Sequence, residues 1–202
     1  MNNASYNSLE LFAPNSKPFG ITYGGWTARW WQWVLSIPKT KNPLLDDTGK
    51  NCANSQTGPV WFLAGTLRGK AERSCNIPAD KAILFPVINF EASVSKGDNT
   101  TEEELAARAK FEMDQITNMR AMIEGTNVDE LKQYRVRSPL FNVILPTDNV
   151  LGLSAQTMKM ISEGYWLFLK PLEPREYNLY SFGSCLAGRI KIDLSYHLTI
   201  EK

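Results

Sequence analysis

The C-terminal stretch Ile190–Ile200, IKIDLSYHLTI, decides the fold class, because its apolar and polar residues alternate without a break. Successive side chains of a β-strand point to opposite faces, so this is the pattern of an antiparallel strand with one face on a core and the other in water. The stretch predicts a β-sheet protein. It also places the only histidine, His197, on the wet face between Ser195 and Thr199.

Shorter runs bounded by turn residues predict further strands. Proline cannot donate a hydrogen bond to a neighbouring strand, so the run that contains Pro86 lies at a sheet edge, is bulged, or ends there. Strands at this spacing indicate a sandwich or a barrel, and we expect an antiparallel β-sandwich of jelly-roll or immunoglobulin-like type. The runs are Val60–Ala64, Lys70–Cys75, Ala82–Ile88, Tyr134–Arg137, Phe141–Leu145, Tyr165–Leu169 and Tyr177–Phe182.

A tryptophan-rich helix is predicted near the N-terminus, over residues 25–36, where the sequence WTARWWQW occupies positions 26–33. Residues three or four apart share a helix face, so we expect Trp26, Trp30 and Trp33 to be buried. Trp31 lies off that stripe, on the more polar side of the helix, and we expect it to be at least partly exposed. Residues 1–20 are predicted to form an extended arm, and residues 21–202 a single domain.

A helical insertion is predicted over residues 101–125. Thr101 followed by Glu104 forms a capping box, and apolar residues at helical spacing continue to Gly125. A lesser helix is expected near Ala155–Glu163, packed like the first against the sheet.

Composition excludes several classes of partner. The chain has 22 basic and 21 acidic residues and a net charge of +1, which disfavours binding to nucleic acid. No apolar run approaches the roughly 20 residues that span a bilayer, so no transmembrane segment is expected. The first residues, MNNASYNSLELFAPNS, lack the features of a secretory leader. The sequence thus predicts a cytoplasmic protein, unless Met1 replaces a removed leader.

Several catalytic chemistries are also disfavoured. One histidine on a wet strand face fits neither a Ser–His–Asp hydrolase nor a zinc hydrolase, and the three cysteines lack paired CxxC spacing. No glycine-rich phosphate motif is present. We assign no catalytic residue, although any two carboxylates can meet in the fold and act as acid and base on a glycan.

Candidate binding residues come from the aromatic and charged positions. Tryptophan offers a flat surface on which sugar rings stack, and Trp31 and Trp61 are the candidates of this kind. Arg68, Arg73 and Glu91 are candidates for a shared polar pocket, with surface ion pairing as the alternative. A long loop, residues 39–58, is itself a candidate functional segment.

A calcium site in that loop is a weaker hypothesis. Asp46 and Asp47, followed by Thr48, Gly49 and Asn51, offer oxygen ligands, but their spacing does not match an EF-hand, and an acidic turn is the alternative. No other cofactor is predicted.

The cysteines divide into a pair and a single residue. Cys52 and Cys75 flank a segment with the pattern of two strands around a turn, which is compatible with a disulfide. Cys185 is predicted to be a free, buried thiol.

Several motifs together resemble a widespread group of uncharacterised microbial proteins, many of which carry secretion leaders. They are WTARWWQWVLSIP, NPLLDDTGKNC, GPVWFLAGT, RSCNIPADKAILFPVIN and GYWLFLKPLEPREYNLYSFG, and they run from about Gly20 to the C-terminus. The resemblance implies an extracytoplasmic β-rich domain with Cys52 and Cys75 as a pair. It carries no established activity. Arg175 and Glu176 depart from the pattern, because related sequences have a glycine turn and a histidine there.

Three functions remain open at this point. The first is a non-enzymatic module that binds carbohydrate or another surface ligand through exposed aromatic residues and the 39–58 loop. The second is a carboxylate-dependent glycan hydrolase or lyase. The third is a structural surface protein that self-associates through a self-complementary apolar patch.

Overall fold

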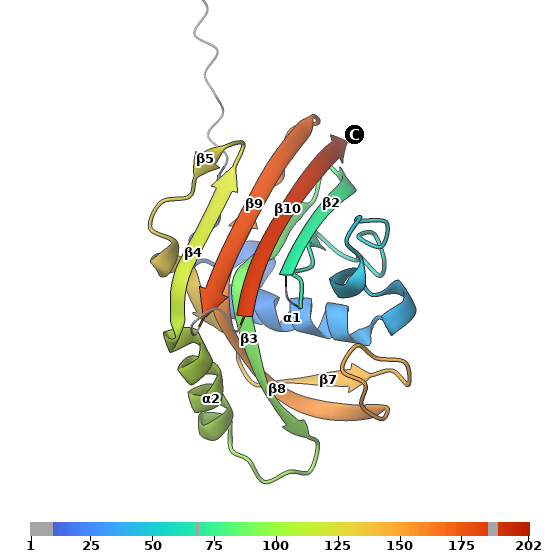
Figure 1. Ribbon diagram of the computed structural model, residues 1–202, viewed down its shortest axis with the longest axis vertical. Coiled ribbons are helices and arrows are strands. Elements are labelled where there is room, and N and C mark those ends of the chain that lie inside the picture. The colour runs from blue at the N-terminus through green and yellow to red at the C-terminus, as the bar shows by residue number, and fades with distance from the viewer. Residues whose placement is uncertain (1–9, 68, 186–189) are drawn as a thin grey trace, which may run out of the picture.

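The protein is mainly β, with two mixed sheets and an N-terminal helix (Figure 1). The computed structural model describes residues 10–67, 69–185 and 190–202. The first sheet contains β1 (Val60–Phe62), β3 (Ala82–Ser95), β8 (Gln156–Leu169) and β6 (Arg135–Arg137) in that order, with β7 (Phe141–Leu145) also paired to β8. The second has the order β2 (Gly69–Pro78), β10 (Ile190–Glu201), β9 (Glu176–Cys185), β4 (Ile116–Ile123) and β5 (Thr126–Asn127).

The alternation in β10 is confirmed, but the expectation of antiparallel sheets is wrong in part. β10 pairs antiparallel with β9 and parallel with β2, and β1 pairs parallel with β3. A residue period of two is common to both kinds of pairing, so the pattern of one strand does not reveal the direction of its neighbours.

The two sheets pack face to face over a common apolar core, to which nearly all the longer strands contribute. The sheets approach closely where β9 crosses β3. A Cβ added at Gly183 would lie only 2.6 Å from the Cβ of Ile88, so a residue without a side chain is needed at this position.

The tryptophan-rich helix α1 (Tyr23–Ser36) covers the other face of the first sheet. Trp26, Trp30 and Trp33 are 3%, 1% and 7% exposed, which confirms the predicted buried stripe. Their indole N–H groups are also satisfied; that of Trp30 donates to the carbonyl oxygen of Leu63 at 2.8 Å. A buried tryptophan with a paired N–H fixes both the position and the rotation of the helix.

The capping box of α2 (Glu102–Asp114) is confirmed. The Thr101 hydroxyl accepts from the Glu104 N–H at 3.2 Å, and the Glu104 carboxylate accepts from the Thr101 N–H at 2.8 Å. However, the helix ends at Asp114 instead of Gly125, because the following residues form β4. Met119 and Ile123 misled the prediction, since a spacing of four fits a helix as well as a strand.

The helix expected near Ala155–Glu163 is wrong, because those residues belong to the long strand β8. From Met160 to Leu169 every residue of β8 is buried, on both faces of the sheet. A strand covered on both sides does not alternate, so its sequence cannot be told from that of a buried helix by period alone. Tyr134, placed in a strand above, ends the short 3-10 helix η4 (Leu131–Tyr134).

The N-terminal arm lies along the end of β8 at Leu11 and Phe12, but it is not extended throughout, because residues 13–16 form a turn in which the Ser16 N–H donates to the Ala13 carbonyl at 2.9 Å. Leu11 bridges to Leu169, and the Phe12 N–H donates to the Phe168 carbonyl at 2.8 Å. Pro18–Gly20 then form the 3-10 turn η1, which leads into α1. No helix in the described ranges is long and apolar enough to cross a membrane.

Candidate functional site

The outward-facing side of the second sheet is a polar strand surface that also carries aromatic side chains. We call it the outer face, and it consists of the exposed or partly exposed side chains of β2, β10, β9 and β4. These four strands lie side by side in Figure 1. They are Lys70, Glu72, Ser74 and Asn76 of β2, Lys191, Asp193, Ser195, His197 and Thr199 of β10, Glu176, Asn178, Tyr180, Phe182 and Ser184 of β9, and Asn118, Arg120 and Met122 of β4.

Strand register arranges these side chains in rows that run across the sheet. One row contains Glu72, Ser195, Tyr180 and Met122, in that order from β2 to β4. The preceding row contains Lys70, Asp193, Phe182 and Arg120. Side chains directly opposite one another on paired strands have Cβ atoms about 5 Å apart, so each row is a continuous strip. Two partly exposed rings, Tyr180 and Phe182, therefore lie side by side along β9 with polar groups around them.

A hollow of about 400 Å³ lies on this face over β4, β9 and β10. This volume is within the range of small-ligand sites, which combine apolar walls with a few polar groups that fix orientation. The side chains that line the hollow mix both kinds; they include Arg120, Met122, Asn178, Tyr180, Ser195 and His197.

His197 ties three strands together at one edge of the hollow. Its Nδ1 lies 2.6 Å from Oδ1 of Asn178 on β9, and its Nε2 lies 3.1 Å from Oε1 of Glu72 on β2. Both neighbouring atoms are oxygens, and a neutral imidazole carries one N–H, so the ring donates a hydrogen bond to at least one of them. The side chain is 52% exposed, so its ring remains accessible to a ligand.

The aromatic rings are also held by charged neighbours. Burial, together with the Asp193 carboxylate and a hydrogen bond to it, raises the pKa of the Tyr180 phenol above its usual value. The hydroxyl is therefore protonated at neutral pH and serves as a hydrogen-bond donor. The Lys191 ammonium lies 5.6 Å from the centre of the Phe182 ring, within the range of a cation–π contact.

Glu72 and Asp193, which flank the middle of the outer face, are turned toward different partners. Glu72 of β2 contacts His197 of β10. Asp193, also on β10, is hydrogen-bonded to Tyr180 on β9, the strand on the other side of β10. Catalytic carboxylate pairs of glycosidases face a common bond from both sides. The arrangement seen here is suited to holding polar groups of a ligand more than to acid–base catalysis.

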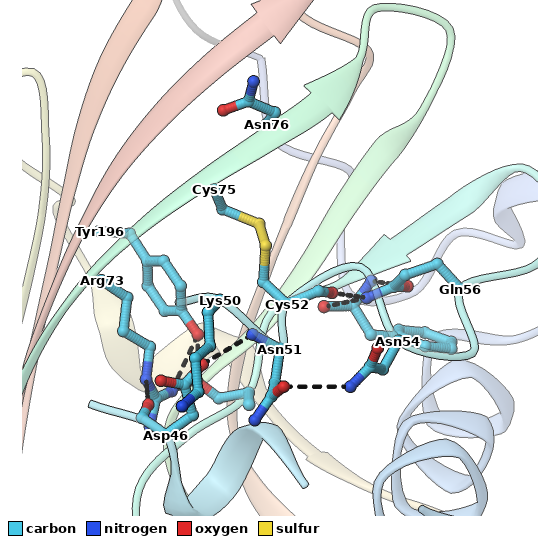
Figure 2. Close-up of a disulfide and its surroundings, with 12 residues drawn as sticks. Asp46, Lys50, Asn51, Cys52, Asn54, Gln56, Arg73, Cys75, Asn76 and Tyr196 are labelled. Atoms are coloured by element: carbon cyan, nitrogen blue, oxygen red, sulfur yellow. Dashed lines mark hydrogen bonds between the residues drawn. A yellow bond between two sulfur atoms is a disulfide. The ribbon is translucent and has the colours of Figure 1, made fainter. Parts of the chain in front are cut away.

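The 39–58 loop is a structural tie between α1, β1 and β2 (Figure 2). The Asn42 amide donates to the carbonyls of Val34 and Ile37, and Gln56 bonds the backbone of Phe62 in both directions. Gly49 has a φ of +92°, and a Cβ there would lie 2.1 Å from the Ser74 carbonyl oxygen. The loop thus runs against the free edge of β2, where Ser74 donates its N–H to Thr48 at 3.0 Å.

The disulfide that was compatible with the sequence is present. Cys52 of the loop and Cys75 of β2 are bonded, with their Cα atoms 6.1 Å apart. Cys185 is a free, buried cysteine, as predicted. In Figure 2 the bridge lies on the side of β2 opposite Asn76, which belongs to the outer face. The bridge therefore fastens the loop to the inward side of β2 and leaves the outer face uncovered.

Arg73 lies beside this bridge and is only 1% exposed. Its guanidinium donates to the carbonyl oxygens of Asp46, Ala64 and Gly65 at 2.6 to 2.8 Å and to the Tyr196 hydroxyl at 2.9 Å. These contacts join the loop, the chain after β1, and β10. Arg73, a candidate ligand residue above, is thus placed in the interior.

The Asp46 carboxylate accepts hydrogen bonds within its own turn. It accepts from the Thr48 N–H and hydroxyl at 3.0 and 2.7 Å and from the Asn51 N–H at 2.8 Å. Burial raises its pKa, but these hydrogen bonds outweigh burial and hold the pKa below its usual value. Asp47 is exposed. Within the described ranges no group of three or more histidine, cysteine, aspartate or glutamate side chains is arranged to hold a metal ion.

The remaining candidate residues are scattered. Trp31 is partly buried against the α1 side of the first sheet, with its ring edge-on to Trp30 at 5.1 Å, and Trp61 is 7% exposed in the core between the sheets. Glu91 lies on β3 beside α2, in the other sheet from Arg73, so these two do not share a pocket. Arg68 lies outside the described residues.

No family model, no curated protein and no solved structure matches this chain. The function proposed below therefore rests on the geometry of the site.

Part of the outer face could have been predicted from the alternation of residues in the sequence. In β9 the segment YNLYSF, Tyr177–Phe182, alternates so that Asn178, Tyr180 and Phe182 share a face. Placing two aromatic rings on a wet face is unusual for a strand that has one face on a core. The strand was predicted above, but the face was not assigned, because its pairing with β10 and β4 involves residues far apart in the chain.

Proposed function

We propose that the protein is a non-enzymatic binding module that holds carbohydrate on the outer face. The observation that supports this most is the pair of partly exposed rings, Tyr180 and Phe182, next to a hollow with hydrogen-bonding side chains. The ligand surface in this proposal is on the strands of the second sheet instead of on Trp31, Trp61 and the 39–58 loop.

The chemistry of a sugar matches this surface. One side of a pyranose ring is flat and apolar and stacks on an aromatic face, while its hydroxyl groups both donate and accept hydrogen bonds. Asn178, Ser195 and His197 offer both donors and acceptors, and Arg120 offers donors at the far side of the hollow. An open sheet surface also lets a chain of sugars extend across several strands.

The catalytic alternative receives less support. A glycan hydrolase or lyase needs two carboxyl groups aimed at one bond, and Glu72 and Asp193 are held by different neighbours. The disulfide supports an oxidising, extracytoplasmic compartment as part of the same proposal. A sandwich of jelly-roll or immunoglobulin type likewise remains part of the proposal.

A glycan array tests this function. The wild-type chain should bind a defined set of glycans, and Tyr180→Ala should lose most of that signal while keeping its melting temperature. Phe19→Ala is the matched control, because Phe19 is an exposed aromatic residue on the α1 side and away from the outer face. Release of new reducing ends from a bound glycan would instead favour the enzyme, and no binding to any glycan would overturn the proposal.

A further inference from the structure

The second half of β3 has an open edge. β1 pairs with β3 only from Ala82 to Leu84, while β8 follows the other edge of β3 as far as Ser95. A register shift between Pro86 and Ile88 bends the strand at the point where its first neighbour ends. Between Ile88 and Ser95, no strand in the described part of the chain covers this edge. Such edges readily pair with another chain.

The hydrogen bonds at the end of β3 reveal which backbone groups point to the open edge. The Lys96 N–H donates to the Thr157 carbonyl of the β8 side at 2.9 Å. Hydrogen-bonded and non-hydrogen-bonded pairs alternate along an antiparallel ladder. Val94, Ala92 and Phe90 therefore direct their backbone groups at β8, and Glu91 and Ser93 direct theirs at the open edge.

A groove of about 620 Å³ runs between this edge and α2. On the strand side it is lined by Phe90, Glu91, Ala92 and Ser93, and on the helix side by Ala107, Arg108, Phe111 and Glu112. Phe111 is 64% exposed, although a phenylalanine on a solvated helix face is unfavourable. The groove therefore combines an unpaired strand edge with an exposed aromatic ring.

Glu91 supplies a second unsatisfied group in the same place. Its Oε2 atom is buried and has no hydrogen-bond partner among the described residues. A buried carboxylate oxygen is costly unless it is paired, so this atom favours contact with a donor from outside the chain.

We infer that the groove is a dimer interface, in which β3 of a second copy of this chain pairs antiparallel with β3 across a two-fold axis at Ala92. In this register Glu91 of each copy stands opposite Ser93 of the other, and these are the residues whose backbone groups face the open edge. The backbone ladder continues from one sheet into the next, and the Glu91 side chain of each copy lies at the junction between them.

The helix side of the groove is self-complementary in the same way. The two-fold axis at Ala92 is perpendicular to the sheet, so α2 and its copy run antiparallel. A residue early in one helix therefore faces a residue three or four positions later in the other. Arg108 of one copy then stands opposite Glu112 of the other, and the two Phe111 rings are covered at the junction. An isologous interface needs this kind of self-matching surface. The inference involves no residue of the outer face, so it is independent of the proposed function.

Light scattering coupled to size-exclusion chromatography tests the inference on the full chain. The wild type should have twice the mass of one chain and should dissociate on dilution. Ser93→Pro, which removes an N–H at the open edge, and Phe111→Asp should each yield a monomer with an unchanged circular dichroism spectrum. Ile144→Asp is the matched control, because Ile144 is 73% exposed on β7 and should leave the dimer intact.

A charge exchange separates this interface from any other. Arg108→Glu alone should weaken the dimer at least tenfold, and adding Glu112→Arg should restore most of the loss. Amide hydrogen exchange adds a direct readout, since the Glu91 and Ser93 amides should exchange slowly in the dimer and quickly in Phe111→Asp. A monomer at all concentrations, or a dimer that resists both Ser93→Pro and Phe111→Asp, would overturn the inference.

Discussion

Arg73 and Tyr196 stand opposite each other on the parallel strands β2 and β10, and the guanidinium donates to the phenol oxygen at 2.9 Å. Burial raises the pKa of the Tyr196 phenol, and Arg73 opposes that shift without reversing it. The phenol therefore remains protonated, and its hydroxyl donates a hydrogen bond to the Ala64 carbonyl oxygen at 2.9 Å. This contact connects the disulfide loop to the sheet that carries the outer face.

Arg73→Met should destabilise the fold strongly. The variant keeps the length of the side chain but leaves the carbonyls of Asp46 and Gly65 without their Arg73 donor, while Ala64 keeps the Tyr196 hydroxyl. Each buried group left unpaired costs about 1–3 kcal/mol, so the free energy of unfolding should fall by at least about 2 kcal/mol. Urea unfolding measures it, with the exposed Arg120→Met as control. Equal stability of the two variants would show that Arg73 is not structural.

Reduction of the Cys52–Cys75 bond should lower the free energy of unfolding by about 3.5 kcal/mol, because a loop of this length regains its entropy in the unfolded chain. Unfolding with and without a thiol reductant measures this change, and mass spectrometry of unreduced peptides verifies the pairing. Cys185→Ala should not alter the response to reductant. A response that disappears in Cys185→Ala would mean that another pairing is responsible.

Two adjacent tryptophans should differ in their contribution to stability. Trp30 is 1% exposed and hydrogen-bonded, whereas Trp31 is only partly buried and its indole N–H has no partner among the described residues. Trp30→Ala should cost about 3–5 kcal/mol through lost burial and an unfilled cavity. Trp31→Ala should cost clearly less. Thermal melts of the two variants decide the matter, and equal melting temperatures would contradict the assignment.

Glu91 should make stability depend on pH. Burial raises the pKa of its carboxyl above the usual value, and a hydrogen bond to Ser93 only partly opposes this. The folded state thus holds the proton more tightly than the unfolded state. The associated stability is fully present below the usual glutamate pKa and is lost as pH rises through the raised pKa of the folded state.

Glu91→Gln should remove this pH dependence. Unfolding in the monomeric Phe111→Asp background, from acidic to neutral pH, should show the parent losing stability relative to the Glu91→Gln variant. Parallel curves for the two proteins would mean that the Glu91 carboxyl is not buried in the folded monomer.

The sequence predicted best the elements that have one wet face. β10 alternates over its whole length and was placed almost to the residue, and β7 was placed with its observed bounds. The capping box gave the start of α2 because its two hydrogen bonds are local. Each of these signals depends only on neighbours within a few residues, so no knowledge of tertiary structure was needed.

The features that failed depend on contacts between distant segments. β8 is covered on both faces and so lost the alternation that marks a strand, and the parallel pairing of β2 with β10 joins residues more than 120 positions apart. The candidate site shifted for the same reason. Tyr180 and His197 become neighbours only through the register of β9 and β10, whereas Arg73 and Trp61 became interior residues.

The measurement that tests the central claim most directly is backbone amide NMR of the protein during titration with the strongest glycan from the array. If the outer face binds carbohydrate, the largest shift changes should fall on Asn178, Tyr180, Ser195 and His197, and His197→Ala should weaken binding at least tenfold. The same variant should change the free energy of unfolding by no more than about 0.5 kcal/mol, because the side chain is exposed. Largest changes in the 39–58 loop or around Trp31, with the outer face unaffected, would contradict the account.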